Sequence, residues 1–404
     1  MKVAVIGGGA AGFFSAINAK ENYPDSEVVI LEKSQKLLAK VKISGGGRCN
    51  VTNGCTSIKD LSKAYPRGDK FLKKAFPVFN TKHAFEWFES RGVPLVVQED
   101  GCVFPVSQSS QSIIDCLFNE IERLGVTIEI GKGVKSIKKI EDKLELSFLD
   151  IKTKSEVYDK IIVATGGSPK RKNLEWLEEL GHKIEEPVPS LFTFNMQKES
   201  ITELMGVVVE KTLVNIQGTK LKSDGPLLVT HWGMSGPAIL KLSAFGARIL
   251  SEKNYEFKVQ VNWTNEQNHN LVMQKLQEIV KEHPNKILAN FRPYLLPERL
   301  WLFLVEKSEL DSTKKWSEIG KKGLNKIVNI LTNDIYQVRG KTTFKEEFVT
   351  CGGISLEDIN VKTMESKVVD NLYFSGELMD IDGITGGYNF QAAWTTGFIA
   401  GKLL

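Results

Sequence analysis

The first residues able to do chemistry form a glycine turn near the start of the chain. Gly7, Gly9 and Gly12 follow the β-branched run 2–6 and open a segment of helical composition, and Glu32 lies 20 residues beyond Gly12. Glycines at this spacing let a strand turn into a helix and let backbone N–H groups approach a pyrophosphate. A carboxylate at the end of the next strand can accept hydrogen bonds from ribose hydroxyls. The pattern predicts a dinucleotide site and leaves NAD and FAD open.

Three later stretches favour FAD. The apolar run 160–164 ends at Gly166, as expected where the chain returns to a dinucleotide. The run 371–377 ends in Gly376 and Glu377, and it resembles a flavin signature whose acid hydrogen-bonds the ribityl chain. The glycines of residues 380–391 precede a predicted last helix. The N–H groups at the start of that helix would stabilise negative charge on a flavin ring.

The most distinctive run spans residues 40–53, where three glycines are flanked by Ser44, Arg48 and Asn50. Together with the runs 230–237 and 376–389, it resembles the BaiN-type flavoproteins, also called aminoacetone oxidase family FAD-binding enzymes, over essentially the whole chain. The resemblance implies one non-covalent FAD and an oxidoreductase. It also implies an α/β, Rossmann-like FAD-binding domain built from both chain ends, with an inserted β-barrel-like domain that carries a helical subdomain.

The resemblance further implies which residues contact FAD. They are Gly9, Ala10, Ala11, Glu32, Lys33, Lys40, Ser44, Gly45, Arg48, Cys49, Asn50, Gly166, Gly376, Glu377, Tyr388 and Asn389. Gly7 and Gly12 of the first turn and Gly387 before the last helix complete the predicted cofactor-binding set.

Two side chains are candidates for chemistry beside the flavin. His231 lies in the Gly- and Ser-containing run 230–237, so we predict a general acid or base, with loop ordering as the alternative. Cys49 follows Arg48, which favours a thiolate, and a small packing residue is the alternative. The five cysteines lack a CxxC pair and the five histidines lack metal-ligand spacing, so we expect reduced thiols and no metal.

The pattern of apolar runs predicts two domains. Residues 1–188 and 346–404 form the FAD-binding domain, and residues 189–345 form the inserted β-rich domain, with a helical part at about 265–332. Residues 33–53 are expected as an extended loop that follows a ligand. We expect the substrate to enter between the two domains, with the 230–237 loop near the flavin.

Composition excludes several classes of protein. The chain has 404 residues, 42% of them hydrophobic and 25% charged, which excludes a disordered, collagen-like or coiled-coil protein. The net charge is +4 and no dense Arg/Lys run is interleaved with aromatic residues, so we expect no nucleic-acid partner. Without an apolar run of about 18–20 residues, we expect no membrane partner and a cytoplasmic location. The oligomeric state stays open.

These observations predict an FAD-dependent oxidoreductase that moves hydride between flavin N5 and a small-molecule substrate or NAD(P)H. An NAD-dependent dehydrogenase is one alternative, but it leaves the pattern at 376–389 unused. A non-catalytic FAD-binding protein is the other alternative, and turnover distinguishes it from the enzyme.

Overall fold

The computed structural model describes residues 1–342 and 349–404. The predicted domain boundary at 345 and 346 therefore lies outside the described residues. The described residues form two compact units, one made of residues 1–190 and 349–404 and the other of residues 191–342. Each unit has its own hydrophobic core.

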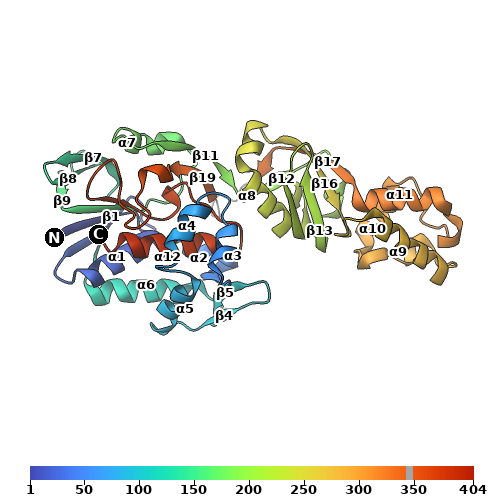
Figure 1. Ribbon diagram of the computed structural model, residues 1–404, viewed down its shortest axis with the longest axis horizontal. Coiled ribbons are helices and arrows are strands. Elements are labelled where there is room, and N and C mark those ends of the chain that lie inside the picture. Colours follow the sequence, from blue (N-terminus) through green and yellow to red (C-terminus); the bar gives the residue numbers. More distant parts are fainter. Residues whose placement is uncertain (343–348) are drawn as a thin grey trace. The chain divides into compact units, whose positions relative to one another are not determined.

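The first unit contains a five-stranded parallel sheet, whose strand β1 is labelled in Figure 1. Its strands, in spatial order, are β6 (Thr127–Ile130), β2 (Glu27–Glu32), β1 (Lys2–Ile6), β10 (Lys160–Val163) and β20 (Leu372–Phe374). Numbered along the chain, this order is 3-2-1-4-5, so its direction reverses between β1 and β10. Ligands of such sheets bind outside the carboxyl ends of the strands at this reversal. The predicted Rossmann-like α/β fold is confirmed.

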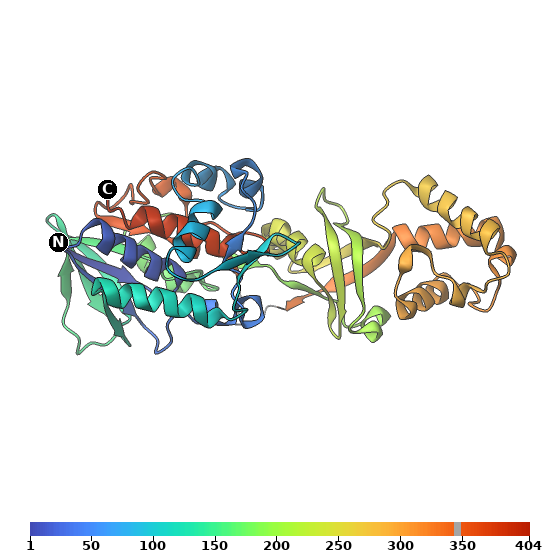
Figure 2. The same ribbon diagram turned by 90° about the horizontal axis from the view of Figure 1, so that it is seen from below.

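Helices from both ends of the chain pack beside this sheet. Helix α1 (Ala10–Asn22) packs against α12 (Tyr388–Ala400) and α6 (Ser110–Leu124) (Figures 1 and 2). Phe13 and Phe14 of α1 are fully buried there. The first and last helices therefore share one core, which holds the two ends of the chain in the same unit.

Smaller elements complete the first unit. Two antiparallel three-stranded sheets consist of β3 (Thr52–Asn53), β5 (Cys102–Pro105) and β4 (Leu95–Val97), and of β7 (Val134–Ile140), β8 (Lys143–Phe148) and β9 (Glu156–Tyr158). Strands β11 (Ile184–Ser190) and β19 (Val349–Ile354) pair antiparallel. The remaining α-helices are α2 (Ala39–Gly47), α3 (Ile58–Lys63), α4 (Asp69–Ala75), α5 (Thr81–Glu89) and α7 (Glu175–Glu178).

The second unit contains a seven-stranded antiparallel sheet and four α-helices. The strand order is β17 (Asp334–Arg339), β16 (Glu256–Asn262), β13 (Val208–Ile216), β14 (Lys222–Thr230), β15 (Gly233–Ser235), β12 (Thr193–Asn195) and β18 (Lys341–Thr342). The helices are α8 (Pro237–Glu252), α9 (His269–Glu282), α10 (Glu298–Lys307) and α11 (Gly320–Thr332). Helices α9–α11 lie together at one end of the unit (Figure 2).

Two local predictions were wrong. Residues 33–53 are not an extended loop throughout, because Ala39–Gly47 form α2, although Ser44, Gly45 and Gly46 inside it have non-helical backbone angles. The 230–237 run is not a free loop, because Gly233–Ser235 pair as β15 with two neighbouring strands.

No helix within the described residues is long and apolar enough to cross a membrane.

Candidate functional site

The glycine turn after β1 lies where the strand order reverses. Gly7 has a φ of 117°, and a Cβ atom placed on it would lie 2.4 Å from the carbonyl oxygen of Ala164, so β1 can end this close to β10 only with glycine. Gly12 faces the same turn, where a Cβ atom would lie 1.9 Å from the Gly7 carbonyl oxygen. Gly9 precedes α1, and a Cβ atom there would meet nothing within 4 Å. Space is therefore open beside Gly9, which directly precedes the positive N-terminal end of α1.

Glu32 ends β2 beside this turn. Its Oε2 accepts a hydrogen bond from the Gly8 N–H at 2.8 Å, and its Oε1 accepts one from the Ser34 N–H at 2.8 Å. Both bonds hold the carboxylate at the carboxyl edge of the sheet, and each oxygen keeps a further lone pair. The geometry fits the predicted role as an acceptor for ribose hydroxyls.

The second predicted acid reaches the same region from the other end of the chain. Gly376 follows β20 with a φ of 74°, and a Cβ atom on it would lie 2.7 Å from the Cβ of Ala11 in the first turn of α1. Glu377 accepts a hydrogen bond from the Thr350 N–H at 2.8 Å and pairs with Lys40 Nζ at 2.7 Å. The fold therefore brings Lys40 and Glu377, 337 positions apart, into direct contact.

Gly166 and Gly167 follow β10, and Gly167 borders this acid. Gly166 has a φ of 73° and a Cβ atom there would meet nothing within 4 Å. At Gly167, a Cβ atom would lie 2.5 Å from Glu377 Oε1 and 2.6 Å from Thr350 Oγ1. The side chain of Thr350 is buried, and its hydroxyl has no hydrogen-bond partner within the described residues. An open turn and an unpaired buried hydroxyl thus lie beside a charged pair.

The distinctive 44–53 run meets the start of the last helix. A Cβ atom on Gly387 would lie 2.1 Å from the Thr52 carbonyl oxygen and 2.9 Å from Asn50 Oδ1. Asn53 Nδ2 donates to the carbonyl oxygen of Gly386 at 2.9 Å. These contacts place the N-terminal end of α12 against the 44–53 run.

A buried ion pair that sequence reasoning missed anchors the segment before α12. Asp382 is fully buried and pairs with Arg67, and it accepts a hydrogen bond from Ser190 Oγ at 2.6 Å. Burial raises the pKa of Asp382 to about 6, while Arg67 opposes that rise. An Arg and an Asp 315 positions apart carry no sequence signal of their pairing.

Several predicted residues use their side chains locally. Arg48 stacks on Phe104, with its guanidinium carbon 4.1 Å from the ring centre. Ser44 Oγ donates to the Val41 carbonyl oxygen. Asn389 exchanges hydrogen bonds with the backbone of Gly383. The others are placed as follows: Ala10 and Ala11 begin α1, Tyr388 begins α12, Lys33 is exposed after β2, and Gly45 has a φ of 58° in α2.

The two candidates for chemistry beside the flavin lie in different units. Cys49 is fully buried, and burial raises the pKa of its thiol to about 12 although Arg48 is its neighbour, so the thiolate that the redox hypothesis needs is disfavoured. His231 belongs to the second unit, where it is exposed in the turn between β14 and β15, with its ring centre 3.9 Å from that of Trp232.

The arrangement in the first unit fits a dinucleotide flavin. Open space lies beside Gly9, before α1, and beside Gly166. Glu32 and Glu377 supply acceptors for hydroxyl groups, and Thr350 supplies a hydroxyl without a hydrogen-bond partner among the described residues. Among the described residues, no cluster of three or more His, Cys, Asp or Glu side chains could hold a metal ion.

Two known proteins match this chain over nearly their whole length. The chain is 26% identical to a 3-dehydro-bile acid delta(4,6)-reductase of Clostridium scindens, over 99% of this chain and 98% of that protein. It is 28% identical to a ribosomal RNA dihydrouridine synthase of Escherichia coli, over 98% of this chain and 95% of that protein.

A solved structure shows the same fold. It is a 3-ketosteroid delta1-dehydrogenase from Sterolibacterium denitrificans, with a TM-score of 0.52 and 10% identity over 99% of this chain and 98% of that one. The family model of the HI0933-like protein Rossmann domain matches residues 1–403. The resemblance predicted from the glycine motifs is confirmed, and the chain belongs to the HI0933-like family.

Proposed function

We propose that this chain is an FAD-dependent reductase of a carbon–carbon double bond conjugated to a carbonyl group. The observation that carries the FAD part of this proposal is the meeting of the glycine turn, Glu32 and Glu377 where the strand order of the parallel sheet reverses. This is the place at which doubly wound sheets bind dinucleotides.

The reaction class is supported by what two relatives have in common. A delta(4,6)-reductase of a 3-dehydro bile acid and a dihydrouridine synthase, as their names state, act on different molecules. In both molecules, the bond that gains hydrogen is conjugated to a carbonyl group. Such a bond accepts hydride at the carbon remote from the carbonyl and a proton at the nearer carbon.

Each part of the site has a proposed task. The N-terminal end of α1 binds the pyrophosphate, Glu32 binds the adenosine ribose, and Glu377 binds the ribityl chain. The N-terminal end of α12 lies against the flavin ring and stabilises negative charge on it. Bound FAD supplies the hydride, and NAD(P)H is the proposed electron donor. His231 is the proposed donor of the proton.

The first test is flavin content followed by turnover. The purified protein should be yellow and release FAD on denaturation. NADH or NADPH should bleach the flavin under anaerobic conditions, and a 3-oxo-Δ4 steroid should restore its absorption. A colourless protein that takes up NAD and no flavin would contradict the cofactor assignment, and a flavin that no enone reoxidises would contradict the reaction class.

A second test concerns His231. Loss of a general acid lowers turnover by roughly 100-fold or more. His231→Ala should therefore bind FAD normally, be reduced by NAD(P)H normally and turn over the enone slowly. Turnover within about threefold of the wild type would remove His231 from the mechanism.

A uridine of ribosomal RNA is the second candidate substrate. The Escherichia coli relative favours it, and so does the uneven charge of this chain, because residues 191–342 hold 21 Lys and Arg against 15 Asp and Glu. This candidate departs from the prediction of no nucleic-acid partner. Incubating the reduced protein with unmodified ribosomal RNA and measuring dihydrouridine by mass spectrometry tests it, and an absence of product at full flavin loading contradicts it.

A further inference from the structure

The unpaired hydroxyl of Thr350 is the feature of the site that its protein contacts leave unexplained. Thr350 lies in β19 and is 1% exposed, and its Oγ1 has no hydrogen-bond partner among the described residues. A buried hydroxyl without a hydrogen-bond partner lowers the stability of the folded chain. A valine has nearly the same shape and carries no such cost.

The surroundings of this hydroxyl point to a ligand. The Thr350 N–H already donates to Glu377 Oε1, and Lys40 occupies Glu377 Oε2, so the carboxylate has a protein partner on each oxygen. Gly167 has no side chain to cover Thr350 Oγ1 or Glu377 Oε1, and its neighbour Gly166 borders open space. The hydroxyl and the carboxylate therefore both lie against Gly167, and open space begins one residue away, beside Gly166.

We propose that Thr350 Oγ1 is a positioning group for the cofactor, which donates a hydrogen bond to the ribityl chain of FAD beside Glu377. This inference rests on the proposed function. The hydroxyl then has opposite effects in two states, because it lowers the stability of the chain without FAD and stabilises the complex with FAD. A threonine with a purely structural role would not show these opposite effects.

The test measures FAD affinity and melting of the apoprotein in parallel. Thr350→Val should weaken FAD binding about 3- to 10-fold, the effect of one neutral hydrogen bond, when apoprotein is titrated with FAD and flavin fluorescence is recorded. The melting temperature of the same apoprotein should stay equal or rise. Thr350→Ser, which keeps the hydroxyl, should bind FAD within about twofold of the wild type.

Thr81→Val is the matched control, because Thr81 is a buried threonine of the same unit whose Oγ1 donates to the Cys55 carbonyl oxygen at 2.7 Å. It should lower the melting temperature of the apoprotein and leave FAD affinity unchanged. Wild-type FAD affinity in Thr350→Val, or equal losses in the Val and Ser variants, would overturn the inference alone. A wild-type chain that binds no FAD would overturn the proposed function as well.

Discussion

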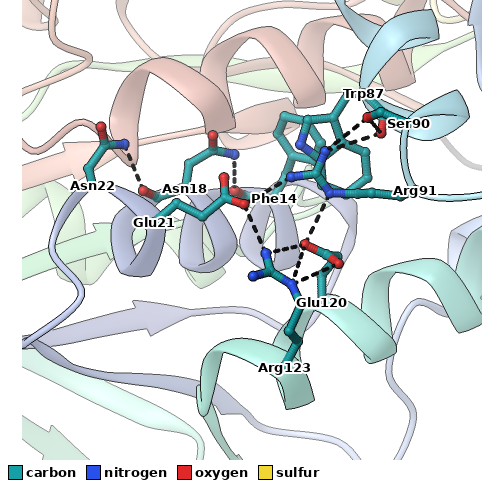
Figure 3. Close-up of polar contacts among 9 residues, drawn as sticks. All are labelled: Phe14, Asn18, Glu21, Asn22, Trp87, Ser90, Arg91, Glu120 and Arg123. Atoms are coloured by element: carbon teal, nitrogen blue, oxygen red, sulfur yellow. Dashed lines mark hydrogen bonds and ion pairs between the residues drawn. The ribbon is translucent and has the colours of Figure 1, made fainter.

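The two ends of α1 carry different clusters of polar side chains. Near its C-terminal end, Glu21, Arg91, Glu120 and Arg123 form an arginine–glutamate cluster (Figure 3). Arg91 pairs with Glu21 at 2.9 Å and with Glu120 at 3.0 Å, and Arg123 Nη2 lies 2.6 Å from Glu120. Every charge in this cluster is opposed by another, and it links α1, α6 and the segment after α5.

The glycine-turn cluster, at the N-terminal end of α1, comprises Lys40, Thr350 and Glu377. It holds one ion pair, one unpaired hydroxyl and open space beside Gly166. An unpaired atom alone does not distinguish the clusters, because Trp87 Nε1 beside the arginine–glutamate cluster also lacks a hydrogen-bond partner among the described residues. That indole, however, packs against aromatic rings and under the Arg91 guanidinium. The combination with open space is what indicates a ligand.

The largest effect on FAD affinity is expected at Glu377, where binding can be measured apart from folding. Glu377→Ala removes an acceptor that we expect to serve FAD, so FAD affinity should fall about 10- to 100-fold, as for a charge-assisted hydrogen bond. Glu377→Gln keeps an acceptor for the Thr350 N–H and should show a smaller loss. Titration of the apoproteins with FAD measures both. Unchanged affinity in a folded Glu377→Ala variant would place the cofactor elsewhere.

The arginine–glutamate cluster should show the opposite response. Glu120→Ala leaves Arg91 and Arg123 with Glu21 as the shared carboxylate that remains, and it should lower the free energy of unfolding by about 1–3 kcal/mol. Chemical denaturation measures this loss. The FAD affinity of the folded variant should match the wild type, and a weakened FAD complex would show that the two clusters are coupled.

Acid should weaken the same cluster. Hydrogen bonds from Arg123 hold the pKa of Glu120 below its ordinary value, with a further contribution from Arg91. The native state therefore binds this proton less readily than the unfolded chain, so the stabilisation is complete above about pH 5 and disappears as the pH falls through the folded-state pKa. The free energy of unfolding, taken from denaturation curves at pH values between 3 and 7, should fall less steeply towards acid in Glu120→Gln than in the wild type. The same pH dependence in both proteins would contradict the assignment.

The sequence predicted those parts of the molecule that local patterns encode. The strand–glycine–helix unit at Lys2–Asn22 has its own spacing. Gly12 is required by a close contact inside that unit, and Gly7 is required by a close contact with Ala164, directly after β10. Thr350 and the Arg67–Asp382 pair were missed because their importance arises from contacts between distant segments. The helix α2 was missed because its glycines and Ser44 obscured a first turn of ordinary helix-forming residues.

The smallest expected effect is at Lys40, which tests whether its pair with Glu377 serves folding or FAD. The Lys40 side chain is 50% exposed, so an ion pair there stabilises the fold by less than about 1 kcal/mol. Lys40→Met should leave the melting temperature of the apoprotein nearly unchanged and weaken FAD about two- to fivefold at low salt, with less effect at high salt because exposed charges are screened. Lys63→Met is the matched control, since Lys63 pairs with Asp60 at the same distance of 2.7 Å on exposed α3 and should not alter FAD affinity. A Lys40→Met loss as large as that of Glu377→Ala would make the lysine, rather than the carboxylate, the main holder of the cofactor.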